Sequence, residues 1–200
     1  MNQLIKKIKD KKDTSFALDY AFTKLAEGVK NRKSHFHLLN LGTVSKDGKP
    51  QTRTIVLRYF DSERKIIRFH TDMRSKKIDE IKNNNSISLL GYDNIDKLQI
   101  RMECEAQIIY SEDFLSDIWS KMNINSKECY SIKKPPGSII NAPQDIDFYS
   151  RNIIPKSFEN FIVVICNIKN IDLLYLHNEG HIRANYRLIN KQFVGNWVIP

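Results

Sequence analysis

The feature that most constrains the fold is a succession of short apolar and β-branched runs, separated by tight turns, that begins near residue 37. Asp47 and Gly48 stand at the centre of the first turn, and Asp-Gly is a typical hairpin dipeptide. Consecutive strands joined by tight turns, with only short helices between them, favour a closed antiparallel barrel. The expected class is therefore mainly β with peripheral helices (α+β), and the first three strands should form a meander. The expected strands are 37–44, 51–60, 65–71, 86–92, 98–110, 161–168, 172–177, 181–188 and 193–199.

Three segments have helical rather than β periodicity. The first covers about 14–30, the second is 76–83 behind Ser75 as the helix cap, and the third is about 114–122 with Trp119 on its apolar stripe. A Pro-Pro-Gly sequence at 135–137 breaks regular structure, so we expect a loop from 133 to about 147.

Length and composition indicate one domain spanning 1–200, with a basic helical segment at 1–33 and the barrel at 36–200. The longest apolar run, 161–166, is far shorter than the roughly 20 residues that cross a bilayer. The first residues have charge without an apolar core, unlike a secretory signal. Three widely spaced cysteines are expected to be reduced thiols. We therefore expect a cytoplasmic protein that does not associate with membranes.

The net charge of +9 suggests an anionic partner: nucleic acid, an anionic membrane surface or a phosphorylated small molecule. Residues 1–33 contain nine Lys or Arg against four Asp or Glu. Nucleic-acid binders usually place aromatic side chains among their basic residues, and residues 1–13 contain none. A solvated basic helix is the simpler interpretation, and nucleic acid is disfavoured as a partner.

No nucleophile motif, phosphate-binding glycine loop or metal-ligand spacing is found, so we expect no metal site. The unusual residues are arginines inside strand-like runs: Arg53, Arg58 and Arg101. An arginine in a strand usually faces solvent or pairs with a carboxylate. Two neighbours favour a ligand-binding role for Arg53 instead: Thr54, which follows it, and the helix start at 75–77. A guanidinium, an ammonium and a helix N-terminus together suit a phosphate monoester.

An ordered set of motifs, at similar separations, resembles the FMN-binding split β-barrel of the pyridoxamine 5′-phosphate oxidase family, and most closely its oxidase-related branch. The resemblance covers about residue 36 to the C-terminus. It includes a Trp-containing helix, a Cys-Tyr and Pro-Gly segment after the barrel core, and a closing strand that ends in Trp-Val-Ile-Pro. The motifs stand at 41–44, 47–50, 53–58, 68–72, 75–77 and 99–100.

The resemblance implies a homodimer with FMN at the subunit interface and a small-molecule substrate, for example a B6 vitamer phosphate. It places Arg53 at the flavin phosphate and Arg58 near the isoalloxazine, where Arg58 would stabilise reduced FMN. By the same resemblance, Arg183 and His181 would hold the substrate ring and its charged groups. The implied cofactor-binding residues are Arg53, Thr54, Ile55, Val56, Leu57, Arg58, His70, Thr71, Lys76, Lys77 and Gln99.

The implied function is an FMN-dependent oxidoreductase that transfers a hydride from pyridoxamine or pyridoxine 5′-phosphate to flavin N5, with oxygen as the final acceptor. The sequence departs from the family near its end. The family's Arg-x-His-x-Arg corresponds to 181–185, where the two basic residues are exchanged and Asn185 replaces the last arginine. The residues that bind the substrate phosphate in the family have no clear counterpart in 118–127. Two alternatives therefore stay open: an FMN-dependent oxidoreductase with another small substrate, and a flavin- or nucleic-acid-binding module without turnover.

Overall fold

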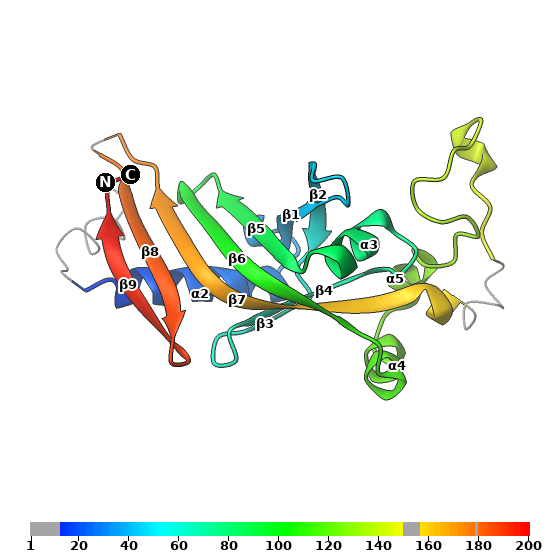
Figure 1. Cartoon of the computed structure of the whole chain (residues 1–200), viewed down its shortest axis with the longest axis horizontal. Coiled ribbons are helices and arrows are strands. Elements are labelled where there is room, and N and C mark those ends of the chain that lie inside the picture. Colours follow the sequence, from blue (N-terminus) through cyan, green and yellow to red (C-terminus); the bar gives the residue numbers. More distant parts are fainter. Residues whose placement is uncertain (1–12, 150–156, 179) are drawn as a thin grey trace.

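The fold is described from a computed structural model, which defines residues 13–149, 157–178 and 180–200. In these residues nine strands form one antiparallel sheet with a few peripheral helices (Figure 1). The strands are β1 (Leu38–Val44), β2 (Pro50–Val56), β3 (Tyr59–Asp61), β4 (Ile66–Asp72), β5 (Ser86–Asp93), β6 (Leu98–Ile109), β7 (Phe161–Tyr175), β8 (Ile182–Ile189) and β9 (Gln192–Val198). The helices are α2 (Ser15–Lys30), α3 (Lys76–Asn83), α4 (Glu112–Ser120) and α5 (Ile124–Glu128), with 3-10 turns at His35–His37 and Pro143–Asp145.

The predicted strand at 51–60 is wrong, because the chain leaves the sheet edge at Leu57 and Arg58. The Leu57 amide donates to the His37 carbonyl at 2.9 Å, whereas the next amide, of Arg58, donates to the Arg68 carbonyl at 3.0 Å. The run therefore divides into β2, which pairs with β1, and β3, which pairs with β4. The strands at the two ends of the order β2-β1-β5-β6-β7-β4-β3 are joined at this crossing, and the sheet curves into a split barrel.

The two pairings of the predicted meander are confirmed, because β1 pairs with β2 and β3 pairs with β4, both antiparallel. The meander is not continuous, however. The strand order is β2-β1-β5-β6-β7-β4-β3, so β4 lies between β3 and β7 and not beside β2. Turn residues in the sequence indicate only where two consecutive strands form a hairpin. Tertiary packing decides which strand pairs along the other edge of each hairpin.

The predicted strands 161–168 and 172–177 form one continuous strand, β7. Two polar residues between them, Lys169 and Asn170, suggest a turn in the sequence. In the structure Lys169 Nζ lies 2.8 Å from Glu105 Oε2, and Asn170 Nδ2 donates to Glu103 Oε2 at 2.6 Å. Cross-strand partners on the outer face thus stabilise polar residues in the middle of the strand.

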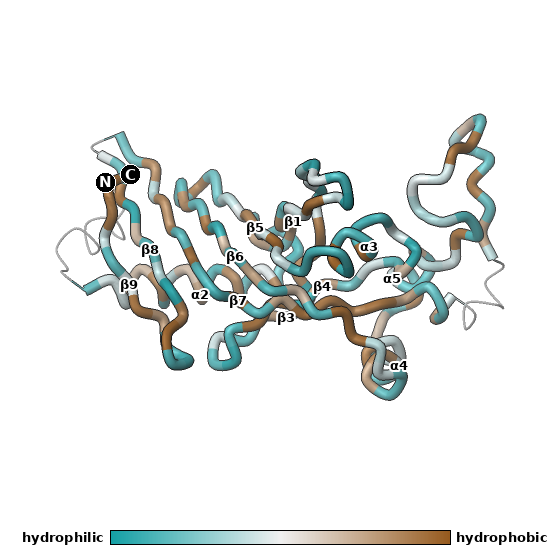
Figure 2. Tube along the Cα trace, in the orientation of Figure 1, coloured by the Kyte–Doolittle hydropathy of each residue, from teal (hydrophilic) through white to brown (hydrophobic). Residues whose placement is uncertain are grey.

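The length of β7 explains how the barrel and the C-terminal strands share one sheet. Its 161–167 half pairs with β4, and its 170–175 half pairs with β8, along the same edge. β6 pairs along the other edge. β6 alternates buried and exposed residues, and Figure 2 shows the matching alternation of hydropathy along β6. The inward-facing residues form a continuous core.

Helix α2 closes one side of the core with Ala17, Ala21, Leu25 and Gly28. It runs beside the sheet that includes β7, β8 and β9 (Figure 1). The prediction of this helix is confirmed. The predicted bounds of α3 agree with the structure at both ends, and those of α4 agree within two residues. The loop expected at 133–147 contains one 3-10 turn, and α5 was not predicted. Of the basic segment at 1–33, residues 1–12 lie outside the described residues.

Candidate functional site

A basic cluster forms where the C-terminal end of β4 leads into α3, opposite β2. Arg53 of β2 donates to Thr43 Oγ1 and to Glu80 Oε2, the latter at 2.7 Å. The Glu80 carboxylate, whose side chain is 9% exposed, also accepts a hydrogen bond from Thr43 Oγ1 at 2.5 Å. This network ties the guanidinium to α3 through Glu80. It is also an ion pair of the kind that an arginine in a strand often forms.

Lys77 supplies the second cation of the basic cluster. Its Nζ donates to Thr71 Oγ1 at 3.0 Å, and no carboxylate of the described residues lies within ion-pair distance. Burial lowers the pKa of Lys77, and the nearby Arg53 lowers it further. A partly desolvated ammonium beside a second cation is stabilised by an anion that bridges the two.

The N-terminus of α3 contributes backbone donors to this cluster. The hydroxyl of Ser75, the N-cap residue, donates to the Asp72 carbonyl at 2.7 Å and makes no side-chain cap. The first amides of a helix have no acceptor within the helix, and its dipole favours negative charge there. Arg53, Lys77 and these amides are donors of the kind that bind a phosphate monoester dianion, so the residues present fit the FMN phosphate.

The remaining predicted residues of the β2 run differ in what they can contact. Ile55 and Leu57 are buried in the core, so only their backbone can reach a ligand. Thr54 is exposed and its hydroxyl donates to Asn40 Oδ1 at 3.4 Å, while Val56 is half-buried. The alternation places Arg53 on the side of Ile55 and Leu57.

Arg58 and His70 lie beyond the basic cluster. The ring of His70 meets Phe161 edge-on, with centroids 5.2 Å apart. Burial, together with the positive charges of Arg68 and Arg58, lowers the pKa of His70 to about 3. The imidazole is therefore neutral at physiological pH, and its buried Nε2 has no hydrogen-bond partner among the described residues.

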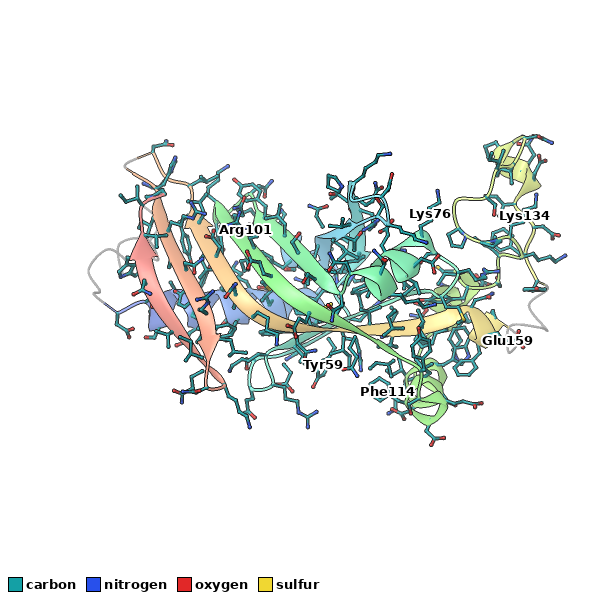
Figure 3. All side chains as sticks on the ribbon, viewed as in Figure 1. Tyr59, Lys76, Arg101, Phe114, Lys134 and Glu159 are labelled. Atoms are coloured by element: carbon teal, nitrogen blue, oxygen red, sulfur yellow. The ribbon has the colours of Figure 1, made fainter. Side chains whose placement is uncertain are left out.

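Gln99 and Arg183 lie on a different surface, the outer face of the β6–β7–β8 sheet. Gln99, Leu174 and Arg183 occupy one row across these strands. Figure 3 shows Arg101, which belongs to the neighbouring row, well apart from Lys76 at the start of α3. The structure thus brings Arg53, Thr71 and Lys77 together and separates Gln99 and Arg183 from them within one chain.

A buried carboxylate organises this outer face. Asp172, 5% exposed, accepts from Arg183 Nε at 3.0 Å and lies 3.5 Å from Arg101 Nη2. Asn185 Nδ2 also donates to it, at 3.5 Å. Asp172 therefore fixes the guanidinium of Arg183 against the strand.

The two other predicted residues are peripheral. His181 is exposed in the turn between β7 and β8, where its Nδ1 accepts from the His177 amide at 3.1 Å. Lys76 is exposed on the first turn of α3 (Figure 3).

Sequence reasoning missed Glu80 and Asp172, the two acids that orient the predicted arginines. Each has a signal in the sequence. Glu80 follows Lys77 by three residues on the predicted helix, and Asp172 interrupts an apolar strand run. A lone acid in an apolar strand usually has a cationic partner.

No helix within the described ranges is long and apolar enough to cross a membrane. The three cysteines are free thiols, with Cys104 and Cys166 buried and Cys129 exposed.

Residues 19–110, which include the basic cluster, match the family model for the pyridoxamine 5′-phosphate oxidase FMN-binding domain. A pyridoxine/pyridoxamine 5′-phosphate oxidase 2 from Arabidopsis thaliana is 41% identical over 49 residues, 24% of this chain and 25% of the relative. A pyridoxine/pyridoxamine 5′-phosphate oxidase from Aeromonas hydrophila subsp. hydrophila is 42% identical over 50 residues, 25% of this chain and 23% of the relative. The match spans about a quarter of the length of these curated relatives.

Solved structures share the fold over nearly the whole chain. A pyridoxamine 5′-phosphate oxidase-related, FMN-binding protein from Nostoc punctiforme PCC 73102 has a TM-score of 0.69 at 22% identity, covering 92% of this chain and 96% of the other. PhzG from Burkholderia lata 383 has a TM-score of 0.71 at 14% identity, covering 95% and 94%. At these identities the similarity concerns the fold. The match over residues 19–110 and the shared antiparallel split-barrel architecture show that this chain is similar to proteins of the pyridoxamine 5′-phosphate oxidase FMN-binding domain family.

Proposed function

We propose that this protein is an FMN-dependent oxidoreductase whose basic cluster binds the flavin phosphate. The observation that carries the proposal is the pair of adjacent cations at a helix N-terminus, where Lys77 has no carboxylate partner among the described residues. A phosphate dianion placed there would accept hydrogen bonds from Arg53, Lys77 and the first amides of α3. Glu80 would keep Arg53 directed at the phosphate.

FMN, when bound, supplies the two-electron redox chemistry of the reaction, and the protein supplies position and charge. Arg58 lies close enough to His70 and Tyr130 to alter the pKa values of both side chains. A cation in this position stabilises negative charge that develops near it. We expect Arg58 to perform this role beside the isoalloxazine, and the neutral His70 to offer a hydrogen bond without adding charge.

A homodimer would complete the site. The outer-face residues Gln99 and Arg183 lie in the row next to Arg101. Arg101 lies well apart from Lys76 at the start of α3 (Figure 3). In a dimer with FMN at the interface, these residues of one subunit would meet the flavin bound by the other. Asp172 would then act as a positioning residue for Arg183. A cytoplasmic location accords with the three free thiols.

The substrate is proposed as a small molecule, with a B6 vitamer phosphate as the first candidate because the local sequence relatives are oxidases of that class. A different small substrate is the second candidate. The observation that favours it is the position of His181, whose Nδ1 is occupied by a backbone amide in an exposed turn. Peroxide formation after addition of pyridoxamine 5′-phosphate to the FMN-loaded protein distinguishes the two.

The phosphate assignment is tested by titrating the protein with FMN and with riboflavin, which lacks the phosphate. Lys77→Gln is expected to weaken FMN binding by about 1.5–3 kcal/mol, the usual contribution of a hydrogen bond to a charged group. The same variant should leave riboflavin binding unchanged. Lys82→Gln, at an exposed position on the same helix, is the matched control. Equal FMN affinity in the wild type and Lys77→Gln would refute the assignment.

A further inference from the structure

Two arginines are half-buried without a charge partner. In the described part of the chain, five arginine residues are half-buried, and three of them pair with a carboxylate: Arg53 with Glu80, Arg74 with Asp72, and Arg183 with Asp172. The other two, Arg58 and Arg68, have no described carboxylate within 4.0 Å. A guanidinium that is partly removed from water and unpaired is costly, because it has lost hydration without gaining an ion pair.

Arg68 of β4 is held between two aromatic side chains. Its guanidinium carbon lies 4.8 Å from the ring centroid of Tyr59 and 6.0 Å from that of Phe114. Phe114 belongs to α4, and Figure 3 shows Tyr59 and Phe114 on the same side of the molecule. Aromatic faces stabilise the cation but accept no conventional hydrogen bond from it. Its Nε is buried and has no partner in the described residues.

The space beside Arg68 is a hollow of about 360 Å³ between β4 and α4, lined by Arg68, His70, Asp117, Ile118, Lys121 and Met122. Arg68 and His70 are two residues apart on β4, so their side chains share a face. The carboxylate of Asp117, on α4, lies 2.7 Å from Nζ of Lys121, the residue that follows the helix. Ile118 and Met122 add apolar surface. The charge of Asp117 acts on Arg68 from across the hollow without forming an ion pair with it. The lining therefore combines a guanidinium that has no carboxylate within ion-pair distance in the described residues with an apolar wall.

We propose that this β4–α4 hollow is a binding subsite for the oxyanion of a small organic acid. Arg68 binds the carboxylate or phosphate group, the neutral His70 offers a second hydrogen bond, and Ile118 and Met122 contact the apolar body of the ligand. That this anion is part of the oxidoreductase substrate rests on the proposed function, because Arg58 is expected to act both near His70 and near the flavin. The anion site itself requires no flavin.

The probes are benzoate, which has an anionic group on an apolar body, and benzyl alcohol, its neutral counterpart. Binding is followed through the ring NMR signals of His70, assigned with His70→Gln, in protein with and without FMN. Wild-type protein is expected to show saturable shifts with benzoate and none with benzyl alcohol. Inorganic phosphate should cause shifts at the same signals with lower affinity, because it lacks the apolar body.

Three variants make the test specific. Arg68→Gln should weaken benzoate binding about tenfold or more, the usual effect of losing a charged hydrogen bond. Asp117→Asn, on the surface of α4, removes negative charge and should strengthen benzoate binding about two- to fivefold. Arg64→Gln, in the β3–β4 hairpin with a side chain 77% exposed, is the control and should change affinity less than twofold.

Equal benzoate shifts with Arg68→Gln and wild type would overturn the subsite. Unchanged or weakened benzoate binding with Asp117→Asn would also overturn the subsite. This second variant tests the subsite even if Arg68→Gln fails to fold. Failure of FMN binding together with Arg68-dependent benzoate shifts would refute the flavin function and leave the anion site intact. FMN binding without Arg68-dependent benzoate shifts would refute the anion site and leave the flavin function intact.

Discussion

At the residue scale, orientation by buried acids distinguishes the candidate ligand-binding arginines from ordinary surface cations. Arg53 and Arg183 each bond to a largely buried carboxylate, Glu80 and Asp172 respectively. Such a pair fixes the guanidinium, and removing one partner leaves a buried charge without compensation.

This coupling leads to a prediction for Arg53→Ala. The variant should bind FMN less tightly by about 1.5–3 kcal/mol, and should also unfold more easily because Glu80 loses its partner. Chemical denaturation measures the stability, and flavin fluorescence quenching measures the affinity. Adding Glu80→Gln should recover part of the stability while FMN binding stays weak. Loss of stability without loss of affinity would show that the ion pair is structural only.

His70 makes stability depend on pH. Its pKa is about 3 in the folded protein, against an ordinary value of 6.5, so the unfolded chain binds a proton between these values and the folded chain does not. The free energy of unfolding should therefore fall as the pH drops below about 6.5, by about 2 kcal/mol between pH 7 and 5 from this residue.

Denaturation of FMN-free protein at several pH values measures this effect. His70→Gln should reduce the loss of stability in acid relative to wild type. The control is His181→Gln, in an exposed turn, which should follow the wild-type curve. Identical slopes for wild type and His70→Gln would contradict the assignment.

At the element scale, the close approach of α2 to the 3-10 turn at His35–His37 depends on one glycine. A Cβ at Gly28 would lie 2.6 Å from the carbonyl oxygen of Phe36, a backbone atom that cannot move aside easily. Alanine is the better helix former by about 1 kcal/mol, so propensity and packing act in opposite directions here.

Packing is expected to dominate. Gly28→Ala should destabilise the protein by about 1–3 kcal/mol, because α2 must shift away from β1 and the core. Thermal or chemical denaturation measures this change. Lys30→Ala, exposed on the same helix, should stay within about 0.5 kcal/mol of wild type. A stabilised Gly28→Ala protein would mean that helix propensity outweighs the contact.

At the scale of the whole molecule, the two groups of predicted site residues lie on separate surfaces, which leads to a prediction about assembly. Light scattering on the FMN-loaded protein should give twice the chain mass of 23.4 kDa, with one FMN per chain. Arg183→Ala should weaken FMN binding even though Arg183 is remote from the basic cluster of its own chain. A monomer that binds FMN with wild-type affinity in this variant would contradict the shared site.

The sequence determined the local features of this protein. Apolar alternation and turn residues predicted most strand positions, and Ser75 with the spacing of Ile78 and Ile81 predicted α3 at both ends. Residue types and order also sufficed to raise Arg53 and Lys77 as a phosphate site, and to identify the family resemblance that the comparisons confirm. These signals are local because side-chain periodicity, capping and turn preference act within a few residues.

Only the tertiary structure decided features that depend on distant partners. The break at Leu57 and Arg58 arises because successive amides bond to His37, just before β1, and to Arg68 in β4, a strand that is not adjacent to β1 in the sheet. The continuity of β7 depends on acidic partners from β6. That no described carboxylate lies within ion-pair distance of Arg68 likewise follows from packing between β4 and α4. Strand pairing and charge compensation join residues far apart in the chain, so no local pattern in the sequence specifies them.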